Sequence, residues 1–184
     1  MNSKYASRGG EKLEHALAQF NIDVKDKICA DFGASTGGFT DCLLKHGAKK
    51  VYAVETGYGL LDWNLRNDAR VVVMERTNAM HVELPELVDF ISIDTSWTRQ
   101  KNILPTALKF LKPGGEMISL LKPHYEAPRQ WLKKGKVDEE RLDEIVLMVK
   151  EELKEIKIKV KDIIKSPISG KKGDNIEYLV WIKN

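Results

Sequence analysis

The sequence predicts an α/β fold, in which a mostly parallel sheet is covered by helices on both faces. Two observations lead to this prediction. Five short apolar runs alternate with segments of helical periodicity, as strands and helices do in parallel sheets. A glycine-rich turn at residues 33–38 also joins the first run directly to a helical segment. Parallel strands joined in this way end at one edge of the sheet, where we expect a ligand site.

Length and composition are those of one folded domain over residues 1–184, in which residues 1–22 form an N-terminal helical extension. Of the 184 residues, 42% are hydrophobic and 31% are charged, which excludes a disordered chain, and the net charge is +3. No apolar run approaches the ~20 residues that cross a bilayer, and no secretory signal begins the chain, so we expect a cytoplasmic protein. Its two cysteines are too few for a disulfide framework or a structural zinc, and we expect no metal.

The expected elements begin with an amphipathic helix at residues 10–20 and a buried strand at residues 28–32. The helix after the glycine turn ends at Gly47. Four further parallel strands are expected at residues 51–54, 71–74, 90–93 and 117–121. Helices are expected at residues 60–66 and 103–111, the second ended by Pro113.

The C-terminal part of the chain predicts a helix and an antiparallel hairpin. Asp138 is expected to cap the helix, whose apolar residues from Leu142 to Leu153 share one face. Residues 156–161 alternate isoleucine or valine with lysine, which predicts a strand with an exposed lysine face. A partner strand is expected at residues 176–182. The hairpin would bring the sheet to seven strands.

The glycine turn leaves three kinds of chemistry open. A nicotinamide dinucleotide would need a glycine where Ser35 stands, because the pyrophosphate approaches the backbone there. A serine hydrolase matches formally, since residues 33–37 read G-x-S-x-G and Asp94 and His124 follow in order, but that motif normally comes after several strands. The third candidate ligand is S-adenosylmethionine, a cationic nucleoside without phosphate.

S-adenosylmethionine suits the polar residues at the strand ends. Asp31 precedes the glycines, Glu55 ends the next strand and could take ribose hydroxyls, and Glu75 and Asn78 follow the third. The fold would then be a Rossmann-like S-adenosylmethionine-dependent methyltransferase domain. The candidate cofactor-binding residues are Asp31, Gly33, Ala34, Ser35, Thr36, Gly37, Gly38, Phe39, Glu55, Glu75, Asn78 and Asp94.

The absence of two motifs restricts which acceptor atom a methyltransferase of this sequence could modify. A base-carbon methylase needs a cysteine nucleophile, but Cys29 falls inside a strand and Cys42 on a helix. An exocyclic-amine methylase typically carries an Asn/Asp-Pro-Pro-aromatic tetrad, where residues 94–97 read DTSW. A hydroxyl acceptor remains. It needs a general base, for which Lys122 is the candidate.

Seven short motifs are spread over the chain. They are residues 7–13 (SRGGEKL), 31–42 (DFGASTGGFTDC), 57–59 (GYG), 75–78 (ERTN), 93–96 (IDTS), 122–123 (KP) and 166–170 (SPISG). Together, between Ser7 and Trp181, they resemble the TlyA-type hemolysin family, which belongs to the FtsJ-like ribose 2′-O-methyltransferases of RNA. The resemblance implies S-adenosyl-L-methionine as cofactor and ribosomal RNA or ribosomal subunits as partner.

The resemblance also implies a catalytic tetrad, which falls on Lys12, Asp94, Lys122 and Glu177. Lys122 would take the proton of the ribose 2′-hydroxyl, and Lys12 would help to hold the oxygen. Asp94 and Glu177 would orient the lysines near the sulfonium. Transfer would be an in-line displacement that depends on positioning and needs no metal.

Basic and aromatic residues near the strand ends are candidates for contact with RNA. They are Arg8, Tyr125, Lys133, Lys134, Lys136, Lys171 and Lys172. Family members usually carry an RNA-binding module before residue 7, and residues 95–100 and 127–129 differ from the usual family sequence, which affects substrate positioning. Two other functions stay open: a non-catalytic RNA-binding or ribosome-assembly protein, and membrane lysis, which the lack of a basic amphipathic helix disfavours.

Overall fold

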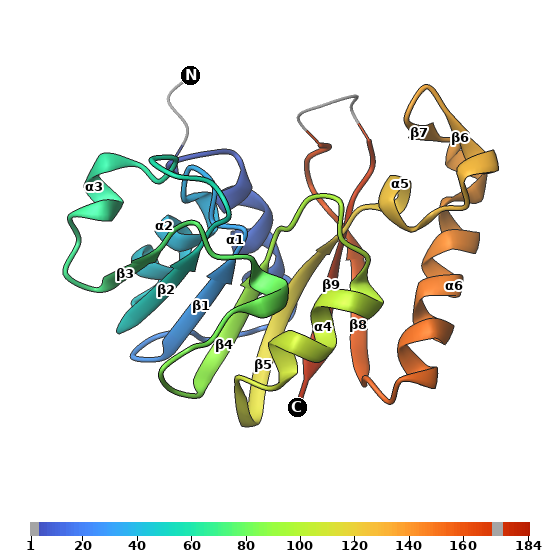
Figure 1. Ribbon diagram of the computed structural model, residues 1–184. Helices are drawn as coiled ribbons and strands as arrows, with labels where there is room; N and C mark the ends of the chain where they lie inside the picture. The colour runs from blue at the N-terminus through green and yellow to red at the C-terminus, as the bar shows by residue number, and fades with distance from the viewer. Residues whose placement is uncertain (1–3, 171–174) are drawn as a thin grey trace.

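The computed structural model describes residues 4–170 and 175–184 and contains a seven-stranded sheet (Figure 1). Its strands are β1 (Ile28–Phe32), β2 (Lys50–Val54), β3 (Val71–Met74), β4 (Val88–Ile93), β5 (Leu111–Leu121), β8 (Val160–Lys165) and β9 (Tyr178–Lys183). They lie in the order β3-β2-β1-β4-β5-β9-β8. Strands β1 to β5 are parallel, and β9 is antiparallel to both of its neighbours, β5 and β8. The predicted mostly parallel sheet with an antiparallel C-terminal strand is confirmed.

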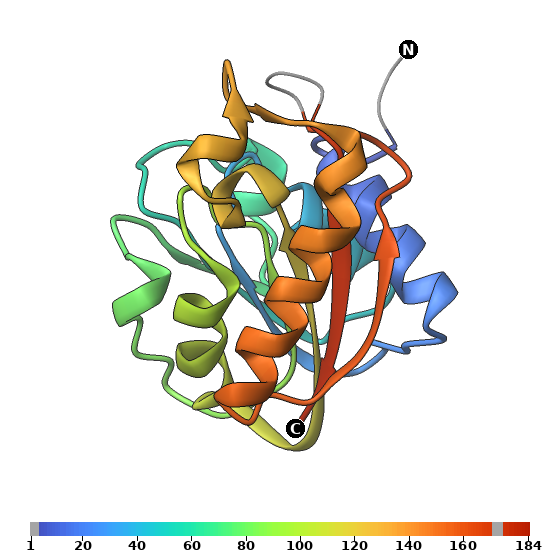
Figure 2. The same cartoon turned by 90° about the vertical axis from the view of Figure 1, so that its right-hand side faces the viewer.

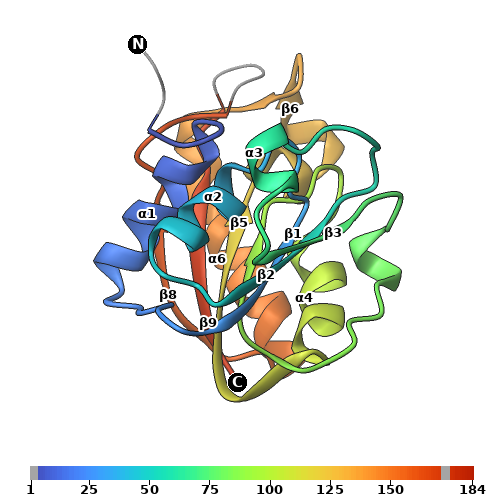
Figure 3. The same ribbon diagram turned by 90° about the vertical axis from the view of Figure 1, so that its left-hand side faces the viewer.

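Helices cover both faces of this sheet, as predicted. They are α1 (Gly9–Gln19), α2 (Gly38–Lys45), α3 (Trp63–Arg66), α4 (Gln100–Leu108), α5 (Pro123–Glu126) and α6 (Leu142–Glu155). Figures 2 and 3 show α1 and α2 on one face and α4 and α6 on the other. Because side chains alternate along a strand, Cys29 packs into the core under α1 and α2, whereas the next residue, Ala30, packs under α4 and α6.

Short elements connect the larger ones. They are the 3₁₀ turns η1 (Ala79–His81), η2 (Arg129–Trp131) and η3 (Glu139–Arg141), and a two-stranded hairpin of β6 (Leu132–Lys133) and β7 (Lys136–Val137). Figure 1 shows this hairpin and α5 at the same end of the molecule as the carboxyl ends of the parallel strands.

The first strand of the predicted hairpin is present, but its predicted bounds, residues 156–161, are wrong, because α6 continues to Glu155 and β8 begins only at Val160. The helix ends in a Schellman motif: Ile158 N donates to Leu153 O at 2.9 Å, and Lys157 N donates to Lys154 O at 2.9 Å. Lys157 takes the left-handed conformation at φ +61°. The alternating isoleucines therefore mark a helix end, where Ile158 and Leu153 are buried in the same core.

Two further boundaries differ from the predictions. The helix expected at residues 103–111 runs from Gln100 to Leu108, and Leu111 already pairs with Val88 as the first residue of β5. The Asp138 side chain does not cap a helix; its Oδ2 accepts a hydrogen bond from Lys133 Nζ at 2.9 Å. The Asp138 carboxylate is therefore paired with an exposed lysine instead of with the backbone N–H groups of a helix.

Candidate active site

A cavity of about 400 Å³ lies at the carboxyl ends of β1, β2 and β4. Its lining residues are Gly33, Ser35, Val54, Glu55, Thr56, Leu60, Thr77, Asn78, Ala79, Met80, Asp94, Thr95, Ser96, Trp97, Thr98 and Ile103. Among these described residues are two carboxylates, Glu55 and Asp94, and no lysine, arginine or histidine. The cavity is therefore suited to a cation or a polar neutral ligand and poorly suited to a phosphate.

Gly33 makes the close approach of β1 to the chain after β4 possible. It has φ +87°, and a Cβ atom built on it would lie 2.5 Å from the Asp94 carbonyl oxygen. Any side chain would therefore both strain the backbone and push away the loop that carries Asp94. Position 33 therefore requires glycine, because the Asp94 backbone lies too close for a side chain.

Glu55 holds the glycine turn in place from the end of β2. Its Oε2 accepts a hydrogen bond from Ser35 N at 2.9 Å, and its Oε1 accepts one from Gly57 N at 2.8 Å. Ser35 itself is in the left-handed conformation at φ +50°. Glu55 thus shapes the cavity and also presents a carboxylate to it.

Asp31 lies away from the cavity and is fully buried. Thr40 Oγ1 donates to its Oδ2 at 2.7 Å, and Ser92 Oγ donates to its Oδ1 at 3.0 Å. Burial, only partly offset by these two hydrogen bonds, raises the pKa of Asp31 to about 7. Its position connects β1, α2 and β4 beneath the glycine turn, so any effect of Asp31 on a ligand is indirect.

Five of the twelve candidate cofactor-binding residues line the cavity, and the other seven do not. Gly33, Ser35, Glu55, Asn78 and Asp94 line the cavity. The candidates that do not are Asp31, Ala34, Thr36, Gly37, Gly38, Phe39 and Glu75. Glu75 instead forms an ion pair with Arg66 and accepts a hydrogen bond from Gly59 N at 2.8 Å, which ties β3 to the loop before α3.

Several lining residues were not identified from the sequence. Five of these eleven residues come just after a strand-end carboxylate that was identified: Thr56 follows Glu55, and residues 95–98 follow Asp94. The sequence therefore did indicate these five positions, because residues just beyond parallel strands lie at the same edge of the sheet.

Lys122 and Asp94 form an ion pair at the edge of the cavity. Lys122 Nζ lies 2.6 Å from Asp94 Oδ1 and donates a hydrogen bond to Thr95 O at 3.1 Å. Asp94 follows β4 and Lys122 follows the adjacent β5, so the sheet itself brings them together. The lysine side chain is 10% exposed, which leaves its ammonium within reach of a ligand that enters beside Asp94.

Lys12 and Glu177 form a second ion pair, 2.5 Å apart between Nζ and Oε2, and both side chains are buried. Lys12 reaches this position because α1 packs very closely on α2. A Cβ on Gly38 would lie 2.9 Å from Gly10 N and 2.2 Å from Ser7 Oγ. The glycines of the Ser-Arg-Gly-Gly segment and of the glycine turn thus serve helix packing as well as ligand approach.

The two ion pairs lie next to each other along the sheet edge. Leu121 pairs with Tyr178 at the end of the antiparallel β5–β9 register, and Lys122 and Glu177 are the next residues of the two chain segments. The order Asp94, Lys122, Glu177, Lys12 therefore alternates carboxylate and ammonium. Of the four residues of the expected tetrad, the structure therefore pairs Lys12 with Glu177 and Lys122 with Asp94.

Arg99 fixes the loop that forms the cavity wall after β4. Its Nε donates to Glu126 Oε2 at 3.1 Å, and its NH2 group contacts both oxygens of Glu152 at 2.9 Å. Burial raises the pKa of Glu126, and Gln100 N donates to this carboxylate at 2.7 Å. The network joins the loop to α5 and α6, and sequence reasoning did not identify it.

The candidate RNA-contacting residues are placed as follows. The Tyr125 ring contacts the rings of Trp97 and His124 in tilted arrangements, with ring centroids 5.2 Å and 4.2 Å away. Arg8, Lys134 and Lys136 are exposed, and Lys133 is exposed but paired with Asp138. Lys171 and Lys172 lie outside the described residues.

Two statements hold for residues 4–170 and 175–184 of the chain. No group of three or more histidine, cysteine, aspartate or glutamate side chains is arranged there to hold a metal ion. Within the same part of the chain, no helix has the length and apolar character needed to cross a membrane.

The sequence matches the family model described as FtsJ-like methyltransferase over residues 5–184. Hemolysin A of Brachyspira hyodysenteriae is 44% identical over 184 residues, which cover 97% of this chain and 76% of that protein. The 16S/23S rRNA (cytidine-2′-O)-methyltransferase TlyA of Mycobacterium tuberculosis is 38% identical over 185 residues, 97% of this chain and 68% of that protein. YqxC of Bacillus subtilis is 46% identical over 186 residues, 97% of this chain. The chain spans 66% of the length of YqxC.

Solved structures agree with the architecture. One from Streptococcus thermophilus has a TM-score of 0.94 and 42% identity, and covers 100% of this chain and 68% of that chain. A structure from Lactococcus lactis has a TM-score of 0.92 and 37% identity, and covers 99% of this chain and 89% of that chain. An S-adenosylmethionine dependent methyltransferase of Mesorhizobium loti has a TM-score of 0.67 at 16% identity, and covers 92% of this chain and 96% of that chain. This last likeness shows the fold alone, the Rossmann-like fold that was predicted.

Proposed function

This chain belongs to the FtsJ-like methyltransferase family, and we propose that it methylates ribose 2′-hydroxyls of RNA with S-adenosyl-L-methionine as methyl donor. One observation carries the proposal: Asp94 lines the cavity and is also paired, at 2.6 Å, with Lys122. A candidate general base thus lies one side chain away from the space for the donor. The Lys12–Glu177 pair completes the proposed tetrad.

The residues of the cavity fit S-adenosyl-L-methionine by their chemistry. The Glu55 carboxylate lies where ribose hydroxyls could donate to it, and Leu60, Met80 and Ile103 provide apolar walls for a purine ring. A carboxylate at Asp94 and the lack of a cation among the lining residues favour a positively charged sulfonium. When bound, this cofactor supplies an electrophilic methyl group.

The proposed roles of the tetrad follow from the two contacts. Lys122, as the neutral amine, would take the proton of the 2′-hydroxyl as its oxygen attacks the methyl carbon. The new O–C bond would replace the bond between the methyl group and sulfur, so that S-adenosylhomocysteine would leave as a neutral thioether. Asp94 holds the Lys122 amine at the cavity edge. Lys12, anchored by Glu177, would help to hold the oxygen. Most of the rate would come from this positioning of donor and acceptor.

The proposed substrate class is ribosomal RNA, and the proposed location is the cytoplasm. TlyA of Mycobacterium tuberculosis, which is 38% identical to this chain, carries 16S and 23S rRNA in its name. Exposed lysines on the β6–β7 hairpin lie near the carboxyl ends of the strands, where they could neutralise phosphates (Figure 1).

The proposal is tested by incubating the purified protein with methyl-labelled S-adenosylmethionine and either deproteinised ribosomal RNA or ribosomal subunits. Label in RNA that resists alkaline cleavage at a defined nucleotide identifies 2′-O-methylation. Label on a base instead of a ribose would refute the assigned acceptor. RNA binding without any transfer would favour a non-catalytic RNA-binding or assembly protein, and leakage of liposomes would favour lysis.

A further inference from the structure

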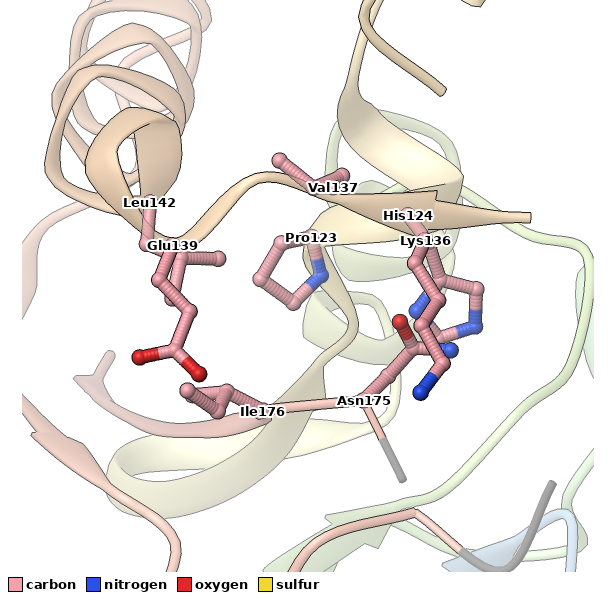
Figure 4. Close-up of a pocket in the computed structure, with 8 residues that line it drawn as sticks. All are labelled: Pro123, His124, Lys136, Val137, Glu139, Leu142, Asn175 and Ile176. Carbon is pink, nitrogen blue, oxygen red and sulfur yellow. The ribbon is translucent and has the colours of Figure 1, made fainter. Parts of the chain in front are cut away.

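A second pocket, of about 160 Å³, lies immediately beside the tetrad. Its walls are formed by Pro123, His124, Lys136, Val137, Glu139, Leu142, Asn175 and Ile176 (Figure 4). Pro123 follows Lys122 in the sequence, and Ile176 precedes Glu177, so the pocket begins one residue from each of two tetrad members. It shares no lining residue with the cofactor cavity.

The walls of this second pocket combine apolar surfaces with hydrogen-bonding groups. Figure 4 shows the Glu139 carboxylate on one side, His124, Lys136 and Asn175 grouped on the opposite side, and the Pro123 ring between them. Val137, Leu142 and Ile176 add apolar contact. A flat heterocycle with donors and acceptors on its edge matches such walls, as unstacked bases do in single-stranded RNA recognition.

His124 adds a hydrogen-bonding group that suits the edge of a neutral heterocycle. Its Nδ1 atom is buried and has no hydrogen-bond partner within the described part of the chain. Burial lowers the pKa of His124, and the Lys122 charge adds to this effect, which favours the neutral imidazole. A neutral imidazole offers one donor and one acceptor, which suits the edge of a base.

We propose that this pocket binds the base of a nucleotide that adjoins the methylated ribose, with a preference for a base that carries an exocyclic amino group. The inference rests on the proposed function. The reacting ribose must face the cofactor cavity, and a pocket without a wall in common with that cavity takes a second nucleotide. The Glu139 carboxylate accepts a hydrogen bond from the amino group of cytosine or adenine and repels the carbonyl oxygen that uracil has in its place.

The test measures binding of fluorescently labelled hexanucleotides of cytidine, adenosine and uridine by anisotropy. We expect the wild-type protein to bind the cytidine or adenosine hexamer at least about fivefold more tightly than the uridine hexamer. Glu139→Gln should reduce this preference to below about twofold, because an amide can also donate to uracil. Glu140→Gln is the matched control, since Glu140 is an exposed neighbour on the same 3₁₀ turn that does not line the pocket.

Equal affinities of the wild-type protein for the three RNAs, or no detectable binding of any, would overturn the inference. So would a preference that survives Glu139→Gln or is lost equally in Glu140→Gln. Methyl transfer to ribosomal RNA is measured separately with the same three proteins. Transfer by a protein without base preference refutes the base pocket and leaves the proposed function standing, whereas base preference without transfer refutes the proposed function alone.

Discussion

Lys12 Nζ lies 2.5 Å from Glu177 Oε2, although 165 positions separate the two residues in the sequence. Their side chains are 9% and 4% exposed. The lysine is on α1 and the glutamate directly precedes β9, so the pair connects the first helix to the last strand. A pair buried to this degree stabilises the protein only while both partners are present, because a single partner is an uncompensated buried charge.

The first prediction concerns the stability of this pair. Lys12→Met should lower the free energy of unfolding by about 3 kcal/mol, because it leaves the Glu177 carboxylate buried without its cation. The double variant Lys12→Met/Glu177→Leu should recover much of that loss. Urea unfolding measures both. Lys133→Met, which breaks the exposed pair with Asp138, is the control and should cost less than about 1 kcal/mol. Additive losses in the double variant would contradict the prediction.

The second prediction concerns the candidate base. Lys122→Met should reduce methyl transfer at least ~100-fold, because no other described group pairs with Asp94 at the cavity edge. Binding of S-adenosylhomocysteine, measured by calorimetry, should change little, since Lys122 does not line the cavity. Lys150→Met, on the exposed side of α6, serves as the control. If turnover persisted in Lys122→Met, another residue would have to be the base.

The sheet could be predicted from the sequence because each parallel strand is a short apolar run that ends at a turn or a charged residue. The end of α6 could not. A helix that ends in a Schellman motif usually shows a glycine at the left-handed position, whereas this one has Lys157 at φ +61°. Without that glycine, the alternation of isoleucine and lysine is equally typical of a strand.

The candidate active site could be predicted only in part, because the sequence does not show which acidic residues reach the cavity. Glu55 and Asp31 are both acidic residues beside the glycine turn, but Glu55 lies beyond the end of β2 and Asp31 lies inside β1, paired with Ala53. Only the packing of α2 and β4 shows that Asp31 is enclosed by Thr40 and Ser92. Lys12 and Glu177 likewise required family resemblance, because nothing local relates a residue on α1 to one before β9.

The third prediction tests the close approach at Gly33. Gly33→Ala should weaken binding of S-adenosylhomocysteine at least about tenfold, because its Cβ would lie 2.5 Å from the Asp94 carbonyl oxygen and displace the cavity wall. Gly59→Ala is a matched control: Gly59 also has a positive φ, +69°, but a Cβ there meets nothing within 4 Å. It should cost only about 1 kcal/mol of stability from its backbone conformation. Equal losses of affinity in the two variants would mean that backbone strain alone is responsible.

The fourth prediction uses the buried carboxyl of Asp31. Burial raises its pKa to about 7 in the folded protein, well above its ordinary value of 3.8. Between these two values the folded state holds a proton that the unfolded state has released, so the contribution of Asp31 to stability is present at low pH and is lost as the pH rises toward 7.

Asp31→Asn removes that titration while keeping the size of the side chain. We therefore expect the unfolding free energy of the variant, relative to that of the wild-type protein, to increase by on the order of 2 kcal/mol between pH 5 and pH 7. Urea unfolding at the two pH values measures this difference, and the titration of other groups cancels because both proteins share it. An offset between variant and wild type that is the same at both pH values would show that Asp31 is ionised in the folded protein, held charged by the hydroxyls of Thr40 and Ser92.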